Sequence, residues 1–142
     1  MRVSAKIDYS CKALLELALH WPKKEPLSIG IIAKNQNIPL PFLNQILITL
    51  KQLGYVESIR GKNGGYFLSR EPRKICLDQL VTDLGSVGYC SAEHSSSKNK
   101  GSVMDFIWDE IDQTVLKMMG EINFEMISQR HRFKRDAVMF HI

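Results

Sequence analysis

Apolar residues recur at helical spacing through the N-terminal third of the chain. Residues 4–19 place them on one face, which predicts an amphipathic helix that ends at Trp21-Pro22, because proline cannot continue a helix. Residues 28–37 predict a short second helix with a serine N-cap. Residues 39–53 predict a third helix, with prolines in its first turn and Gly54 as its stop. This succession of helices is typical of a helix-turn-helix domain.

The next segment changes from helical to alternating periodicity. Residues 55–60 and 66–69 predict two strands, and the glycine-rich residues 61–65 between them accept the positive φ angles of a tight turn. A hairpin directly after the third helix is the wing of a winged helix. Arg60 and Lys62 give its tip positive charge without an acidic residue. An ordinary solvated hairpin is the alternative interpretation.

The second half of the chain predicts one short helix and one long one. Residues 77–85 form the short helix, and the patternless, polar residues 85–101 predict a functional loop or a disordered one. The long helix is expected from Ser102 to about Phe124, and the basic residues 130–135 are expected to form a frayed, solvated tail. Six apolar residues in the long helix follow a heptad seam, which favours pairing with a second copy over packing on the chain's own domain. They are Met104, Trp108, Ile111, Val115, Met118 and Ile122.

Composition indicates one globular domain. The chain has 142 residues, of which 44% are hydrophobic and 24% charged, and it contains no apolar run of the roughly 18 residues that a membrane span needs. Its N-terminus does not resemble a signal peptide, so we expect a cytoplasmic protein. The cysteines, Cys11, Cys76 and Cys90, are too few and too widely spaced for a disulfide framework or a zinc site. We interpret Cys11 and Cys76 as packing residues.

Charge divides the chain into unlike halves. Residues 1–76 hold twelve Lys and Arg against five Asp and Glu, a net charge of +7, whereas residues 77–142 have a net charge of −3. Only the N-terminal half is therefore expected to meet a polyanion. The predicted organisation is a winged helix-turn-helix domain at 1–76, a short helix and sensor-like loop at 77–101, and a dimerisation helix with a basic tail at 102–142.

Two other classes of function remain to be weighed. An enzyme is not expected, because no Ser/His/Asp or Cys/His constellation, phosphate-binding loop or pair of carboxylates stands in a supporting context. A protein-interaction adaptor that keeps the winged-helix fold is the alternative to a DNA-binding protein. The basic hairpin tip and the lack of acidic residues in the third helix count against it.

Four segments resemble a known family. They are Met1-Arg2-Val3-Ser4-Ala5-Lys6, the helix that follows to Leu19, the helix Phe42-Leu43-x-x-Ile46-Leu47-x-x-Leu50, and above all the wing Arg60-Gly61-x-x-Gly64-Gly65-Tyr66-x-Leu68. Together they resemble the Rrf-two (Rrf2) family of bacterial regulators, which includes an iron–sulfur cluster regulator, a nitric-oxide-sensing repressor and a cysteine-metabolism repressor. The similarity extends from Met1 to about Trp108.

The resemblance implies a mainly helical, homodimeric winged-helix regulator of transcription that binds a pseudo-palindromic operator in double-stranded DNA. The helix at 41–53 would enter the major groove, where Asn44, Gln45 and Thr49 would meet base edges, and the wing would place Arg60 in the minor groove. The glycines would let the backbone turn and approach phosphates. The expected contact residues are Arg2, Lys6, Ser28, Pro41, Asn44, Gln45, Thr49, Lys51, Arg60, Gly61, Lys62, Gly64, Gly65 and Tyr66.

Many relatives hold an iron–sulfur cluster with the pattern Cys-x5-Cys-x5-Cys-x2-His, and this chain departs from it. Cys90, Ser96, Ser102 and Asp105 stand at the four positions, and serine replaces a thiolate poorly. Ser102-x-x-Asp105 also has a structural explanation as a capping box. We therefore expect no cofactor. Two alternatives remain, a 2Fe–2S cluster on a reduced set of Cys90, Asp8, His94 and Asp105, or a redox-responsive thiol at Cys90.

Overall fold

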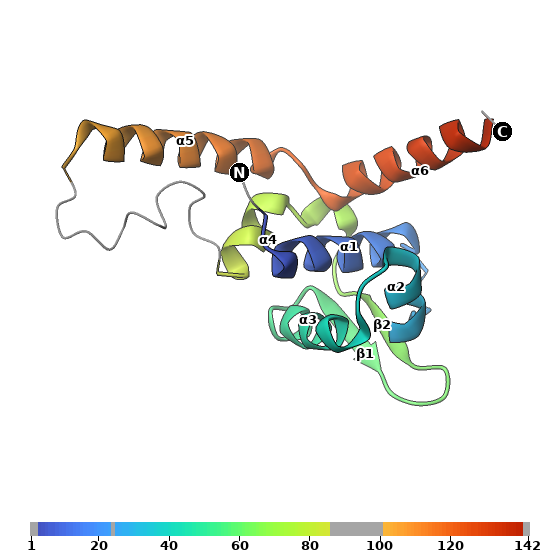
Figure 1. Ribbon diagram of the computed structural model, residues 1–142. Helices are drawn as coiled ribbons and strands as arrows, with labels where there is room; N and C mark the ends of the chain where they lie inside the picture. Colours follow the sequence, from blue (N-terminus) through green and yellow to red (C-terminus); the bar gives the residue numbers. More distant parts are fainter. Residues whose placement is uncertain (1–2, 24, 86–100, 141–142) are drawn as a thin grey trace.

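The computed structural model describes residues 3–23, 25–85 and 101–140 of the chain. The predicted mainly helical fold with a single hairpin is confirmed for these residues (Figure 1). In chain order the elements are α1 (Ala5–Leu19), α2 (Ile29–Gln36), α3 (Leu40–Gln52), β1 (Val56–Ile59), β2 (Gly65–Leu68), the 3₁₀ turn η1 (Pro72–Lys74), α4 (Leu77–Asp83), α5 (Val103–Gly120) and α6 (Phe124–Phe140).

Helix α1 is the centre of the fold. It lies between α6 on one side and α3 with the hairpin on the other (Figure 1), and it packs on α2 as well. It supplies Ala13, Leu14 and Leu17, all buried, to a core that also takes in Leu47 of α3 and Phe124 of α6. Burial of this stripe on both sides holds the helix-turn-helix in a fixed orientation.

The predicted helix ends are confirmed by their caps. Ser4 and Ser28 are the N-caps of α1 and α2, and each side chain accepts a hydrogen bond from the backbone N–H three residues later. Asn37, at the turn between α2 and α3, adopts the left-handed conformation with φ 52°. Gly54 follows α3 with φ 83°, which a residue with a side chain rarely adopts.

The hairpin is antiparallel and is joined to the rest of the domain by a third backbone segment. Val56 pairs with Leu68 at its base and Ile59 with Gly65 at its outer end. Leu27, before α2, forms an antiparallel bridge with Tyr66, through hydrogen bonds of 2.9 and 2.8 Å in the two directions. The bridge fixes the wing against the start of α2.

The expectation of one long helix to Phe124 is wrong. Helix α5 ends at Gly120, and a new helix, α6, begins at Phe124. The Asn123 side chain accepts a hydrogen bond from the Met126 N–H, as an N-cap does, and Leu77 N–H donates to the Ile122 carbonyl at 2.9 Å. Ile122 therefore belongs to the connection between two helices, although its spacing continues the seam of α5.

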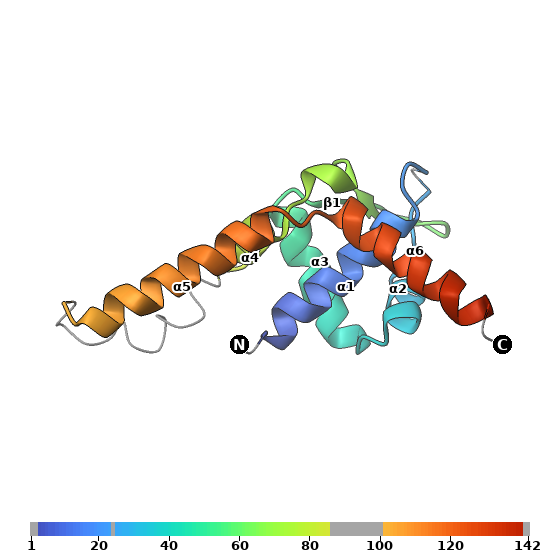
Figure 2. The same cartoon turned by 90° about the horizontal axis from the view of Figure 1, so that it is seen from above.

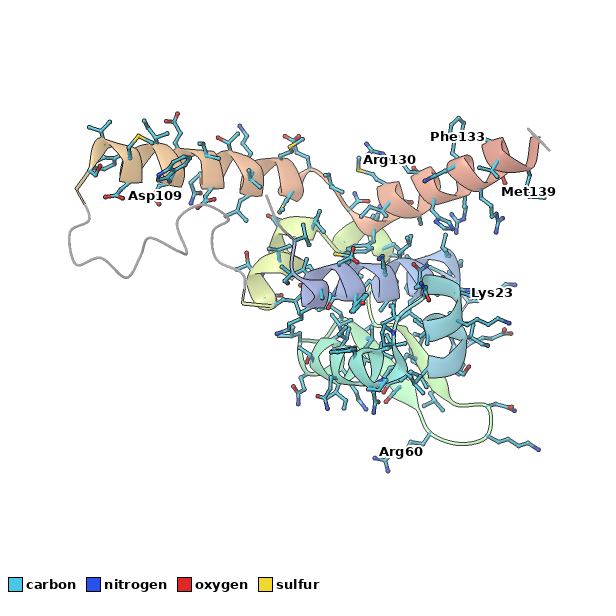
Figure 3. All side chains as sticks on the ribbon, viewed as in Figure 1. Lys23, Arg60, Asp109, Arg130, Phe133 and Met139 are labelled. Carbon is cyan, nitrogen blue, oxygen red and sulfur yellow. The ribbon has the colours of Figure 1, made fainter. Side chains whose placement is uncertain are left out.

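The expectation of a frayed tail is also wrong. Residues 130–135 lie within the 17-residue helix α6, which packs on α1 and donates a hydrogen bond of 3.2 Å from Arg132 to the Leu19 carbonyl. The cause is the apolar side of this helix, where Phe124 is fully buried and Ile127 packs against the core. Its cations, including the labelled Arg130, remain exposed as expected (Figure 3).

Helix α5 extends away from the body of the chain (Figure 2). Near its C-terminal end Val115 packs against the core and Met119 is buried, but much of its apolar surface is exposed. The exposed apolar residues of α5 are Val103, Met104, Phe106, Ile107, Ile111 and Met118. None of the helices within the described ranges combines the length and apolar character needed to cross a lipid bilayer.

Candidate nucleic-acid interface

Helix α3 has one buried face and one outward face. Leu43, Ile46, Leu47 and Leu50 recur at helical spacing and point into the core, with exposed fractions of at most 6%. At about 100° per residue, the opposite face takes Pro41, Asn44, Gln45, Ile48 and Gln52, all exposed. Because the side of α3 with the leucines and isoleucines is buried, the side-chain amides of Asn44 and Gln45 face the exterior.

Two further residues predicted on α3 make contacts within the chain. The Thr49 hydroxyl donates to the Gln45 carbonyl at 3.1 Å, so its proton is already used, while its lone pairs remain. The exposed Lys51 Nζ donates to Ser58 Oγ of β1 at 2.6 Å. This bond joins the last turn of α3 to the wing and holds a positive charge between them.

An open groove of about 720 Å³ separates α3 from the wing. Ile48, Lys51 and Gln52 line it from α3, and residues 58–62 and 64–66 line it from the hairpin. Its cations are Lys51, Arg60 and Lys62, and none of its described lining residues is acidic. Figure 3 shows Arg60 extended away from the body at the hairpin. The predicted cationic turn and polar helix face are thus brought together on one side of the domain.

The paired glycines of the wing are required by close backbone approach. A Cβ at Gly65 would lie 2.1 Å from the Leu27 carbonyl oxygen, and one at Gly64 would lie 2.3 Å from the Ile59 carbonyl oxygen. Gly61 has nothing near its missing side chain, but its φ is 121°. The predicted need for glycine therefore has a cause inside the domain. The missing side chain of Gly64 lets the turn of the hairpin close on itself, and that of Gly65 lets the hairpin meet the segment before α2.

The other predicted contact residues are less well placed for the groove. Ser28 lines its edge, but its hydroxyl oxygen accepts the capping hydrogen bond from Ile31 N–H, and Tyr66 is half-buried beside it. Lys6 does not line the groove; its Nζ donates to the Leu84 carbonyl after α4 at 3.4 Å. Arg2 lies outside the described residues.

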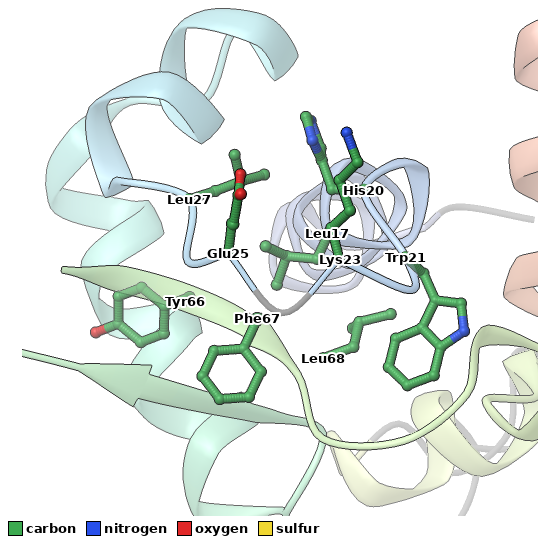
Figure 4. A pocket seen from close by; sticks show the side chains of 9 residues that line it. All are labelled: Leu17, His20, Trp21, Lys23, Glu25, Leu27, Tyr66, Phe67 and Leu68. Carbon is green, nitrogen blue, oxygen red and sulfur yellow. The ribbon is translucent and has the colours of Figure 1, made fainter. Parts of the chain in front are cut away.

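A second hollow, beside β2, is too small for a ligand. It is lined by Leu17, Trp21 and Tyr66 among others, which come from α1, the turn after it and β2 (Figure 4). Its volume of about 10 Å³ is no more than a single water molecule needs. The hollow beside β2 therefore has no room for a substrate.

Sequence reasoning missed a buried carboxylate that holds the helix-turn-helix together. Glu16 of α1 is only 4% exposed and accepts hydrogen bonds from the side-chain amides of Asn35 at 2.7 Å and Gln36 at 2.8 Å. Both amides lie at the end of α2, so the contact fixes α2 on α1. The signal available was a charged residue between the buried positions of the first helix, opposite two amides at the end of the second.

Comparison with known proteins decides the family. The sequence model of the Rrf2 family, described as an iron-dependent transcriptional regulator, matches residues 3–130. The chain belongs to the Rrf2 family. The resemblance inferred from the wing motif is thereby confirmed.

The relatives are regulators of transcription. The putative HTH-type transcriptional regulator slr0846 of Synechocystis is 46% identical over 84 residues, which cover 59% of this chain and only 56% of that relative. The regulator IscR of Xenorhabdus nematophila is 26% identical over 88% of this chain and 77% of its own length. These relatives confirm the expectation that the chain is not an enzyme.

Solved Rrf2 structures share the fold. IscR of T. potens matches with a TM-score of 0.78 and 29% identity over 92% of this chain and 88% of that one. CymR, the global cysteine regulator of B. subtilis, matches with a TM-score of 0.78 and 25% identity over 92% and 98%. The likeness extends past the winged helix, because it covers nearly the whole of both chains.

Of the four candidate cluster ligands, the two that the structure describes both have partners within the chain. The Asp105 carboxylate accepts hydrogen bonds from the Gly101 and Ser102 N–H groups at 3.3 and 3.1 Å, in the predicted capping box. Asp8 pairs with Lys12 at 2.6 Å. Cys90 and His94 lie outside the described residues, and within the described ranges no three His, Cys, Asp or Glu side chains gather as a metal site would need.

Of the two described cysteines, Cys11 is a packing residue, as predicted. Cys11 contacts the core, and its burial, followed by the charge of Asp8, raises the pKa of the thiol to about 11. The thiol is therefore protonated at neutral pH and is a poor nucleophile. Cys76 is half-buried and directly precedes α4.

Proposed function

We propose that the chain is a sequence-specific, DNA-binding transcriptional regulator that acts as a homodimer. The observation that carries the proposal is the groove with Lys51, Arg60 and Lys62 on its walls, beside the exposed amides of Asn44 and Gln45. Cations supply attraction to phosphates that does not depend on sequence, and amides can pair with both N6 and N7 of adenine. The combination suits duplex DNA.

Each element has a separate role in this proposal. Helix α3 enters the major groove and presents Asn44 and Gln45 to base edges, while the Thr49 hydroxyl accepts a hydrogen bond through its lone pairs at the side of the helix. The wing lies along the backbone and directs Arg60 to a narrow minor groove, whose negative potential attracts the guanidinium. Lys51 and Lys62 neutralise phosphates between the two.

The homodimer is proposed from the exposed surface of α5. Within the described ranges, Met104, Ile111 and Met118 have exposed fractions of 45%, 38% and 64% on one face of a helix that leaves its own domain. An apolar surface of this extent is typical of an interface. Met104, Trp108, Ile111 and Met118 of the predicted seam are available for it, whereas Val115 and Ile122 have neighbours in their own chain. A second copy of α5 is the partner that repeats the same surface.

Arg60→Ala tests the role of the wing. Loss of one arginine contact costs about 1–3 kcal/mol per wing, so a dimer with two wings should bind at least about 30-fold more weakly. The measurement is fluorescence anisotropy on a duplex recovered by selection from random DNA. In parallel, the logarithm of the wild-type association constant should fall linearly with the logarithm of the salt concentration. Each neutralised phosphate contributes about −0.9 to this slope, and we expect several of them.

Arg73→Ala is the matched control for this experiment. Arg73 is an exposed arginine that pairs with Glu71 and does not line the groove, so its removal should leave affinity within about twofold. Equal losses in the two variants would show that only total charge matters. Unchanged binding by Arg60→Ala would remove the wing from the proposed interface.

A further inference from the structure

One aliphatic side chain lies in the middle of the outward face of α3. Ile48 follows Asn44 by four residues and Gln45 by three, so it stands one helical turn further along the same face. It is 41% exposed and lines the cationic groove. The interior takes the leucines and isoleucines on the other side of the helix, so burial does not explain an isoleucine here.

The surroundings distinguish Ile48 from Phe42, which is also an exposed apolar residue of this helix. The Phe42 ring packs against Tyr9 of α1, with ring centroids 6.3 Å apart, and so has a partner in its own chain. Ile48 instead shares the groove with Ile59 of β1, which is 49% exposed. The Lys51–Ser58 hydrogen bond connects the same two elements. An apolar strip, defined by Ile48 and Ile59, thus lies within a cationic groove.

We infer that Ile48 reads the 5-methyl group of thymine in the major groove of the operator. The inference rests on the proposed function and names one feature of its ligand. Thymine is the base of unmodified DNA that presents an apolar group in the major groove, and aliphatic side chains contact it. The helical rise places Ile48 about 6 Å from Asn44 along the axis, so it meets a base roughly two steps from the one that Asn44 reads.

The charge of the groove favours DNA over a protein partner for this strip. Lys51, Arg60 and Lys62 surround Ile48 and Ile59, and the described lining contains no acidic residue. An apolar protein surface would have to place acidic residues opposite all three cations. A duplex supplies phosphates on both sides of a groove floor that carries methyl groups, so it complements the cations and the strip at once.

The test replaces thymine with deoxyuridine, which removes only the methyl group. In the duplex recovered by selection, each thymine is replaced singly, and then in both half-sites together, and binding is measured by anisotropy. Loss of one buried methyl group weakens binding about 4-fold, so the symmetric replacement should weaken it about 15-fold at the position that Ile48 contacts. Ile48→Ser should bind the thymine and uracil duplexes equally.

Val138→Ser is the matched control. Val138 is an exposed aliphatic residue, 55% accessible, on α6, across α1 from the groove, so this variant should keep the wild-type ratio of affinities. The ratio compares two duplexes on one protein sample, so partial unfolding of a variant does not distort it.

Three results would overturn the inference. In the first, the wild-type protein binds every uracil duplex as tightly as the thymine duplex. This result contradicts the inference even if the Ile48→Ser variant does not bind DNA at all. The Ile48→Ser variant could keep the full discrimination against uracil. In the third, the wild-type protein binds no duplex at all. This result would contradict the proposed function as well, whereas the first two results would contradict only the inference about Ile48.

Discussion

Replacing Gly65 with alanine is expected to destabilise the domain by about 3 kcal/mol or more, because a side chain there forces backbone segments apart. The new Cβ would lie 2.1 Å from the Leu27 carbonyl oxygen and 2.8 Å from the Ser28 nitrogen. The two Leu27–Tyr66 hydrogen bonds cannot survive at that separation, and the wing loses its attachment to the start of α2. Urea denaturation measures the loss of stability, and anisotropy at a temperature where the variant is folded measures the loss of operator binding.

Gly30→Ala is the control for the same change elsewhere. A Cβ at Gly30 meets nothing within 4 Å, and the residue lies in the first turn of α2. Alanine is the better helix former, so this variant should be unchanged or up to about 1 kcal/mol more stable. If Gly65→Ala matched the wild type in both stability and binding, the close contact between the wing and Leu27 would be refuted.

Replacing Ile111 with aspartate is expected to convert the proposed dimer to monomers. Ile111 lies on the exposed face of α5 with Met104, Ile107 and Met118, within an arc of about 60°. A symmetric dimer contains each substitution twice, and losing about 1.5 kcal/mol or more of apolar burial per copy raises the dissociation constant about 100-fold or more. Analytical ultracentrifugation over a range of protein concentrations measures this dissociation constant.

Gln113→Asp provides the comparison for α5. Gln113 is exposed on nearly the opposite side of the same helix, so it receives the same new charge away from the apolar face. We expect this variant to remain dimeric and to bind operator as the wild type does. A dimeric Ile111→Asp protein would exclude this face of α5 from the interface.

Much of the winged helix could be predicted because its local signals and its packing agree. Ser28, Asn37 and Gly54 mark the ends of α2 and α3 in the sequence, and each has the expected role in the structure. The alternation of residues 55–60, followed by glycines, predicted the hairpin, and the structure adds its register, with Val56 opposite Leu68. The capping box of Ser102 and Asp105 is a local signal of the same kind.

The C-terminal half was predicted less well because an apolar period can continue across a break. Ile122 keeps the heptad spacing of α5, yet Gly120 ends that helix and Asn123 caps the next. Buried Phe124 shows why the break is stable, since it draws the start of α6 into the core beside α4. Such long-range packing has no local signature.

The groove itself could be predicted only in part. Charge and glycine content located Arg60 and Lys62 at a turn, and periodicity placed Asn44 and Gln45 outside. Ile48 was not distinguished, because an isoleucine in an apolar helix is ordinarily assigned to the core. Its position depends on which face of α3 meets α1, and packing decides that.

The most direct measurement of the DNA-reading role of α3 is the interference of 7-deazapurines with operator binding. This replacement removes the N7 acceptor, which is accessible only in the major groove. If the amides of Asn44 and Gln45 pair with N7, replacement of particular purines should weaken operator binding by about 5-fold to 100-fold. These purines should fall in two sets about 10 base pairs apart, or a multiple of that distance. If no replacement weakened binding, α3 would not read base edges, and the account would be contradicted.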